Sequence, residues 1–179
     1  LGNVLAGENI RLGIANTGRV NLFAAADGLV NFNPDHINSI NAVNEGITIA
    51  TLNLHERVSI NQIVATIKII PFAVSLKDLD SVQKLANDNN YIINIQPFQA
   101  RNAALLQTTL PGIKTKILDK TSVVLAAKLG NLGSHLIMEI KCEHNYNSIA
   151  KGLQEIITTG VELILVMGAS ATTDRRDVI

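Results

Sequence analysis

The chain has 179 residues, of which 47% are hydrophobic and 17% charged, so its composition is that of a folded protein with room for two small domains. Its formal net charge is zero, and 3% of its residues are aromatic with no Trp, which argues against the basic field and stacking platforms of nucleic-acid binding. Because Cys142 is the single cysteine and no apolar run reaches the roughly 18 residues of a membrane span, we expect a cytoplasmic protein outside the membrane.

Residues 1–90 carry the signals of a small β-rich region. Asp27 and Gly28 form one turn-like break, and residues 44–46 form another. Pro71 bounds the last apolar run of the region. Alternating or β-branched runs predict strands over residues 20–22, 47–52 and 63–70.

Two helix starts are visible in the same region. Asn33 can cap a short helix that has Pro34 at its first position. Ser75 followed by Asp78 is typical of a capping box, and it predicts a helix over residues 75–87. The apolar residues expected to face the core are Ile37 and Ile40 in the first helix, and Leu76, Leu79, Val82 and Leu85 in the second.

A polar run at residues 87–90 ends this region. Residues 91–99, which include Pro97, are expected to form either a linker or a strand that crosses between domains. We therefore divide the chain into an N-terminal β-rich α+β region, residues 1–90, and a C-terminal α/β domain, residues 91–179.

After this boundary the pattern alternates between strands and helices. Two successive strand–helix–strand units predict a parallel sheet with helices on its faces, which is a three-layer, Rossmann-like α/β fold. The expected strands are residues 103–108, 136–140 and 161–167, and the expected helices are residues 113–129, ending at Gly130 or Gly133, and 147–158. The residues expected to face inward are Leu118, Val124 or Leu125, Leu129, Leu132, Ile149, Leu153, Ile156 and Ile157.

Ligands of such sheets bind at the carboxyl ends of the strands. The loops that follow the three expected strands are residues 108–116, 142–147 and 168–177. The third loop combines small residues, which let the backbone approach an anion or a flat ring, with hydroxyls that can donate hydrogen bonds and carboxylates that can accept them. The alternative is a strand-to-helix turn capped by Thr173 or Asp174, with its arginines in solvent.

Other polar residues near these loops have two interpretations. Three lysines near the first loop can neutralise a phosphate, but they also suit a solvated helix face. These are Lys114, Lys116 and Lys120. Glu143 and His144 are too few for a metal site, so we expect a loop histidine and no metal there. Cys142 is expected to be a small buried residue at a strand end and not a nucleophile.

The last strand, its small-residue loop and the pair Arg176-Asp177 resemble the signature of the molybdopterin-binding domain shared by molybdopterin adenylyltransferases and molybdopterin molybdenumtransferases. That signature typically reads Gly-Gly-Thr or Ser-Gly, a few residues and then Asp, often after Arg. The resemblance extends back to about Ala103 through the order of strands and helices, and residues 119–121 are similar to the family's acidic position followed by a small polar residue. With residues 68–72, these motifs resemble a bacterial group that carries an extra N-terminal β-rich region.

The resemblance implies that the ligand is molybdopterin, a pterin fused to a dithiolene-bearing ring with a terminal phosphate. It implies that Asp119 and Asp177 act as catalytic carboxylates on ring N–H groups or on a Mg²⁺ ion that carries ATP. It also implies a role in molybdenum cofactor biosynthesis, by nucleotidyl or molybdenum transfer, and it is compatible with a homo-oligomer. The residues implied to bind the cofactor are Gly168, Ala169, Ser170, Ala171, Thr172, Thr173, Asp174 and Thr121.

The third loop departs from the family pattern at several positions. Ala169 replaces the second Gly, Ala171 stands where a Gly is common, and the loop is one residue longer, so that Asp174 or Asp177 can occupy the acidic position. After the second strand, the family often has an Asp where this chain has residues 142–145. These departures favour the alternative of a non-catalytic cofactor carrier or regulatory binding module.

Two further alternatives remain at this stage. An unrelated nucleotide-dependent enzyme lacks support, because neither common glycine-rich nucleotide motif follows an expected strand. The second of these alternatives is a structural interaction domain.

Since the chain begins at Leu1 without Met and stops at Ile179 just after the third loop, we expect a fragment of a longer protein.

Overall fold

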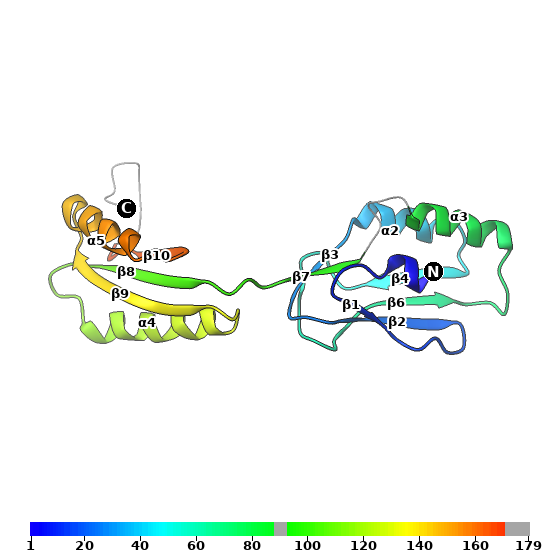
Figure 1. Ribbon diagram of the computed structural model, residues 1–179, viewed down its shortest axis with the longest axis horizontal. Coiled ribbons are helices and arrows are strands. Elements are labelled where there is room, and N and C mark those ends of the chain that lie inside the picture. The colour runs from blue at the N-terminus through cyan, green and yellow to red at the C-terminus, as the bar shows by residue number, and fades with distance from the viewer. Residues whose placement is uncertain (88–92, 171–179) are drawn as a thin grey trace. The chain divides into compact units, whose positions relative to one another are not determined.

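The computed structural model describes residues 1–87 and 93–170, and it forms two compact units, Leu1–Phe98 and Gln99–Ile179 (Figure 1). The sequence placed the domain boundary after residue 90. Strand β7 (Asn94–Pro97) lies in the expected boundary region, and it pairs antiparallel with β3 (Gly28–Asn31) of the first unit. The first unit is called unit 1 below, and the second is called unit 2.

Unit 1 contains two antiparallel sheets. The first has the strand order β1-β2-β6-β4 and the second has the order β5-β3-β7. The strands predicted from alternating or β-branched runs are confirmed as β2 (Arg19–Ala24), β4 (Ile47–Thr51) and β6 (Ile63–Ile69). Three further strands were not predicted, and all of them are short: β1 (Ile10–Leu12), β3 and β5 (Arg57–Val58). Gly28, expected in a turn, instead begins β3.

The helices of unit 1 are α1 (Gly2–Leu5), α2 (Pro34–Asn41) and α3 (Leu76–Asn87). Both predicted caps are confirmed: Asp35 N–H donates to Asn33 Oδ1 at 3.0 Å, and Asp78 N–H donates to Ser75 Oγ at 3.0 Å. Leu76 was expected to face the core and is 78% exposed, because α3 packs through positions further along the helix. The buried residues of the two longer helices are Ile37, Ile40, Val82 and Ala86.

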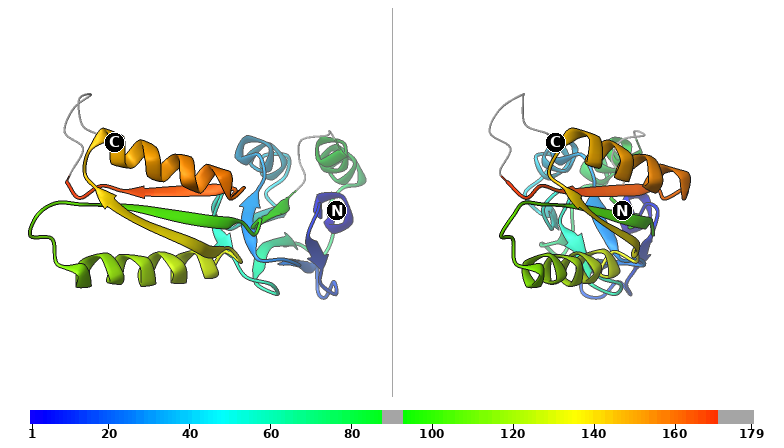
Figure 2. Two further views of the ribbon diagram at one scale, coloured as in Figure 1. Left: turned by 60° about the vertical axis from the view of Figure 1, so that its left-hand side comes forward. Right: turned by 90° about the vertical axis from the view of Figure 1, so that its left-hand side faces the viewer.

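Unit 2 contains a parallel three-stranded sheet in the order β10-β8-β9. Its elements along the chain are β8 (Asn102–Thr109), α4 (Thr115–Gly130), β9 (His135–Glu143), α5 (Tyr146–Thr158) and β10 (Leu163–Met167). The two predicted parallel strand–helix–strand units are therefore confirmed. Figure 2 shows α4 and α5 on opposite faces of this sheet.

The helices of unit 2 pack on a central strand that is buried along most of its length. Ala104 and Leu106 of β8 form a core cluster with Ile149 and Ile156 of α5. Within the described residues, no helix is long and apolar enough to cross a membrane.

Two predicted inward positions of unit 2 are wrong. Ile157 is 64% exposed, because adjacent helical residues point about 100° apart and Ile156 already faces the sheet. Leu132 is exposed because it follows the end of α4. Of the two alternatives in α4, Leu125 is half-buried, whereas Val124 is exposed. The helix ends at Gly130, and Gly133 adopts a left-handed φ of 73° in the turn that follows.

Candidate functional site

The connections of β8 and β9 diverge at the carboxyl end of the sheet. The two strands are neighbours, but β8 leads into α4 on one face and β9 leads into α5 on the other. Such a divergence leaves a crevice outside the strand ends, where open α/β sheets bind ligands. A pocket of about 490 Å³ lies there, lined by Thr109, Leu110, Pro111, Glu143, His144 and Asn145. The structure thus brings two of the three predicted loops together.

His144 joins the ends of all three strands. Its Nδ1 is hydrogen-bonded to Thr108 Oγ1 of β8 at 2.8 Å, and its Nε2 is hydrogen-bonded to Ser170 Oγ, beyond β10, at 3.1 Å. Its backbone N–H donates to the carbonyl of Thr109 at 3.0 Å. The ring is therefore held between β8 and the loop after β10, beside the pocket.

The start of the third loop is fixed by the same threonine. The backbone N–H of Ala169 donates to Thr108 Oγ1 at 2.7 Å. Gly168, Ala169 and Ser170 therefore lie at the carboxyl edge of the sheet, and their predicted role in binding the cofactor stays a prediction. The other loop residues named in that prediction lie outside the described residues, namely Ala171, Thr172, Thr173 and Asp174, together with the predicted catalytic residue Asp177.

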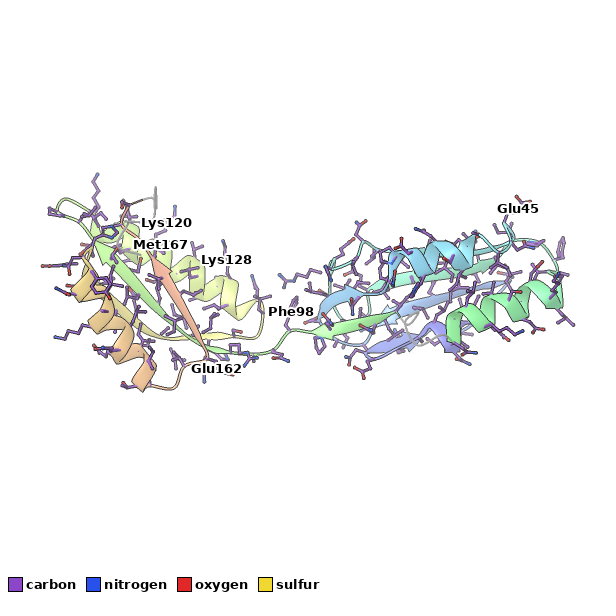
Figure 3. All side chains as sticks on the ribbon, turned by 90° about the horizontal axis from the view of Figure 1, so that it is seen from above. Glu45, Phe98, Lys120, Lys128, Glu162 and Met167 are labelled. Atoms are coloured by element: carbon purple, nitrogen blue, oxygen red, sulfur yellow. The ribbon has the colours of Figure 1, made fainter. Side chains whose placement is uncertain are left out.

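The N-terminus of α5 borders the pocket. Asn145, which lines the pocket, caps this helix by accepting a hydrogen bond from Ser148 N–H at 2.9 Å. A helix N-terminus carries a partial positive charge that favours anions. Two exposed lysines lie at the start of α4: Lys114 is the residue before the helix, and Lys116 is in its first turn. Figure 3 marks Lys120, one turn further into α4, together with Met167 at the end of β10.

Asp119 and Thr121 lie on α4 and are not among the residues that line this pocket. Asp119 Oδ1 forms an ion pair with Lys141 Nζ at 2.9 Å, and Thr121 Oγ1 donates to the carbonyl of Ile117 at 3.0 Å. The Asp119 and Glu139 carboxylates together raise the pKa of Lys141. The predicted catalytic role of Asp119 and the predicted binding role of Thr121 stay predictions.

A polar cluster lies beneath α4. Gln107 is fully buried in β8, and its Nε2 donates to Glu139 Oε1 and to Ser122 Oγ, each at 3.0 Å. Lys141 Nζ lies 3.2 Å from Glu139 Oε1. Burial acts to raise the pKa of Glu139, but hydrogen bonds from Ser122, Lys141 and Gln107 outweigh it and hold that pKa below its ordinary value. Gln107 Oε1 is buried without a partner among the described residues.

Cys142 was expected to be buried at a strand end; it is half-buried near the end of β9 and packs against the α5 core cluster. Burial raises the pKa of its thiol, and the nearby Glu143 carboxylate raises it further. A thiol of this kind is a poor nucleophile. No group of three or more His, Cys, Asp or Glu residues in the described part of the chain is arranged to hold a metal ion.

Comparisons of the chain with protein-family models, curated proteins and solved structures found no match. His144 was predicted to be an ordinary loop histidine, and its contacts with Thr108 and Ser170 were not predicted. Its position directly after a strand of the parallel sheet was the available signal.

Proposed function

We propose that unit 2 binds molybdopterin at the carboxyl edge of its parallel sheet, in a step of molybdenum cofactor biosynthesis or handling. The observation that carries the proposal is the His144 ring, hydrogen-bonded to Thr108 and Ser170 next to the pocket between β8 and β9. This arrangement lies at the place predicted from the strand order. The three layers around the parallel sheet support the Rossmann-like assignment as part of the same proposal.

The pocket has the size and chemistry for such a ligand. Its volume of about 490 Å³ falls within the range of about 300–1,000 Å³ that small-molecule sites occupy. The N-terminus of α5 and the hydroxyl of Ser170 suit a terminal phosphate. Glu143, Asn145 and Thr109 offer acceptors and donors for the polar edge of a pterin ring.

The second candidate is binding without catalysis, as a carrier or regulatory module. The ion pair between Asp119 and Lys141 favours it. A carboxylate that is neutralised by a lysine is a weaker ligand for Mg²⁺ than one that is free, so nucleotide transfer has less support than pterin binding.

The test is an anaerobic titration of the full chain with molybdopterin, followed by pterin fluorescence. We expect saturable binding by the wild-type protein and binding about tenfold weaker for His144→Gln, because a hydrogen-bonding ring at the site is lost. His135→Gln is the matched control, since His135 begins β9 at the other end of the same strand. Equal affinities for both variants, or no binding by the folded wild-type chain, would overturn the proposal.

Addition of Mg²⁺ and ATP to the same titration separates the two candidates. An adenylylated product, detected by mass spectrometry, would establish nucleotidyl transfer. If molybdopterin is unchanged after prolonged incubation, the result supports binding without catalysis, as a carrier or regulatory module.

The loop resemblance makes a further prediction about the residues beyond Ser170. Asp177→Asn should weaken molybdopterin binding more than Asp35→Asn, which removes a carboxylate from α2 of unit 1. Equal effects of the two substitutions on the fluorescence titration would reject the assignment of Asp177.

A further inference from the structure

Thr108 differs in position from the residues that line the pocket. It lies at the end of the central strand β8 and is 1% exposed, whereas its neighbour Thr109 lines the pocket. Its Oγ1 accepts the hydrogen bond from Ala169 N–H and is also bonded to Nδ1 of His144. One buried hydroxyl thus connects β8 both to the start of the third loop and to the histidine.

The distances around Thr108 indicate where its proton lies. The hydroxyl has one proton, and two acceptors are within reach: Nδ1 of His144 at 2.8 Å and the carbonyl of Met167 at 3.5 Å. Since hydroxyl donors form good hydrogen bonds at about 2.5–3.0 Å, the proton is directed to His144. A neutral imidazole that accepts at Nδ1 carries its own proton on Nε2.

The Nε2 proton then points to the loop after β10. Nε2 lies 3.1 Å from Ser170 Oγ, so it donates to that oxygen. Ser170 accepts this bond and keeps its own hydroxyl proton for another acceptor. The order of donation therefore runs from Thr108 through His144 to Ser170, at the exposed end of the network.

We infer that Thr108 is a positioning residue of this site: it fixes His144 in the Nε2–H tautomer and holds the start of the third loop at Ala169. Ser170, which accepts from Nε2–H, then presents its own hydroxyl proton to the phosphate oxygens of the ligand. The identity of the ligand rests on the proposed function. The effect of Thr108 on His144 does not depend on the proposed function, because it follows from contacts within the protein.

The test measures the tautomer of His144 and the affinity for molybdopterin in the same full-length variants. Nitrogen NMR of the imidazole rings distinguishes Nδ1–H from Nε2–H. Thr108→Val keeps the β-branched shape but removes the hydroxyl, whereas Thr108→Ser keeps the hydroxyl. Thr109→Val is the matched control for the tautomer, since Thr109 Oγ1 donates to the carbonyl of Cys142 and not to His144.

We expect His144 to be the Nε2–H tautomer in the wild type, in Thr108→Ser and in Thr109→Val, and to become a mixture in Thr108→Val. Molybdopterin binding should weaken about tenfold in Thr108→Val, because Ser170 is then no longer held to donate its hydrogen bond to the charged phosphate. In Thr108→Ser the affinity should recover to within about threefold of wild type.

An Nδ1–H tautomer of His144 in the wild type would overturn the inference, even where Thr108→Val does not fold. In folded Thr108→Val, an unchanged tautomer would overturn it as well. So would a changed tautomer with an unchanged affinity for molybdopterin. Failure of the wild type to bind molybdopterin would instead reject the proposed function, and the tautomer comparison would still decide whether Thr108 positions His144.

Discussion

The two units are stabilised in different ways. Unit 1 has a core cluster of sixteen buried apolar residues among those described, drawn from both of its sheets and from its helices. In unit 2 the cluster under α5 contains four, and polar side chains connect the sheet to α4 and connect the strand ends to one another. The candidate site therefore lies in the unit with the smaller apolar core cluster.

The two units also differ in the residues that line their pockets. Unit 1 has a pocket of about 450 Å³ lined by Thr17, Gly18, Ile69, Ile70, Pro71 and Phe72. Its volume is close to that of the pocket in unit 2, but its lining is largely apolar. Volume alone therefore does not distinguish the candidate site. The candidate site is distinguished by the groups beside the pocket of unit 2: His144, the ends of the strands and the N-terminus of α5.

The largest expected effect comes from removing core side chains. Leu22→Ala in unit 1 should cost about 3–4 kcal/mol of unfolding free energy, and Leu106→Ala in unit 2 about 2 kcal/mol, because the core cluster that contains Leu22 has sixteen buried members and the one that contains Leu106 has four. Both losses of unfolding free energy can be measured by urea denaturation, with hydrogen exchange followed separately in each unit. A larger loss from Leu106→Ala would contradict the comparison of the two cores.

A medium effect is expected from adding a methyl group to glycines at close contacts. A Cβ on Gly28 would lie 2.2 Å from the carbonyl oxygen of Gln96, while a Cβ on Gly152 would lie 2.6 Å from Cδ1 of Leu106. Backbone cannot move without breaking the pairing of β3 with β7, whereas a leucine tip can turn. Gly28→Ala should therefore cost about 3 kcal/mol and Gly152→Ala about 1 kcal/mol.

A double substitution sharpens this prediction. Shortening the leucine in the variant Gly152→Ala with Leu106→Val should recover part of the loss, as a coupling between the two positions. Thermal unfolding of the single and double variants gives that coupling. Strict additivity would show that the close contact is not the cause.

The smallest expected effect is the pH dependence due to Glu139. Its pKa is lower in the folded chain than its ordinary value of 4.5, so its stabilising contribution is complete above about pH 4.5 and is lost as the pH falls through the folded pKa. Glu139→Gln should flatten the acid limb of the stability curve slightly, and Glu155→Gln, on the exposed side of α5, should not. Identical acid limbs for wild type and Glu139→Gln would contradict the assignment.

Local sequence signals predicted the elements that depend on neighbouring residues. Asn33 with Pro34 and Ser75 with Asp78 determine helix starts within a few positions, and both were confirmed. Strand β5 has two residues and could not be recognised, because its order depends on pairing with β3 and not on a pattern of its own. Gly28 was misplaced because its close approach to Gln96 is a tertiary contact.

The candidate site divides in the same way. The strand order predicted which loops would meet, and the structure brings the first two together at the pocket. The partners of His144 could not be predicted, because Thr108 and Ser170 lie 36 and 26 positions away and become neighbours only through the parallel sheet.

Amide NMR during an anaerobic titration with molybdopterin maps the ligand on the protein and tests the proposed site directly. We expect the largest shifts at the carboxyl edge of the sheet in unit 2, and we expect them to saturate. Shifts centred on the apolar pocket of unit 1, or none in a folded chain, would contradict it. The amides to follow are those of Thr109, Leu110, His144, Asn145 and Ser170, with Gly18 and Phe72 as the comparison.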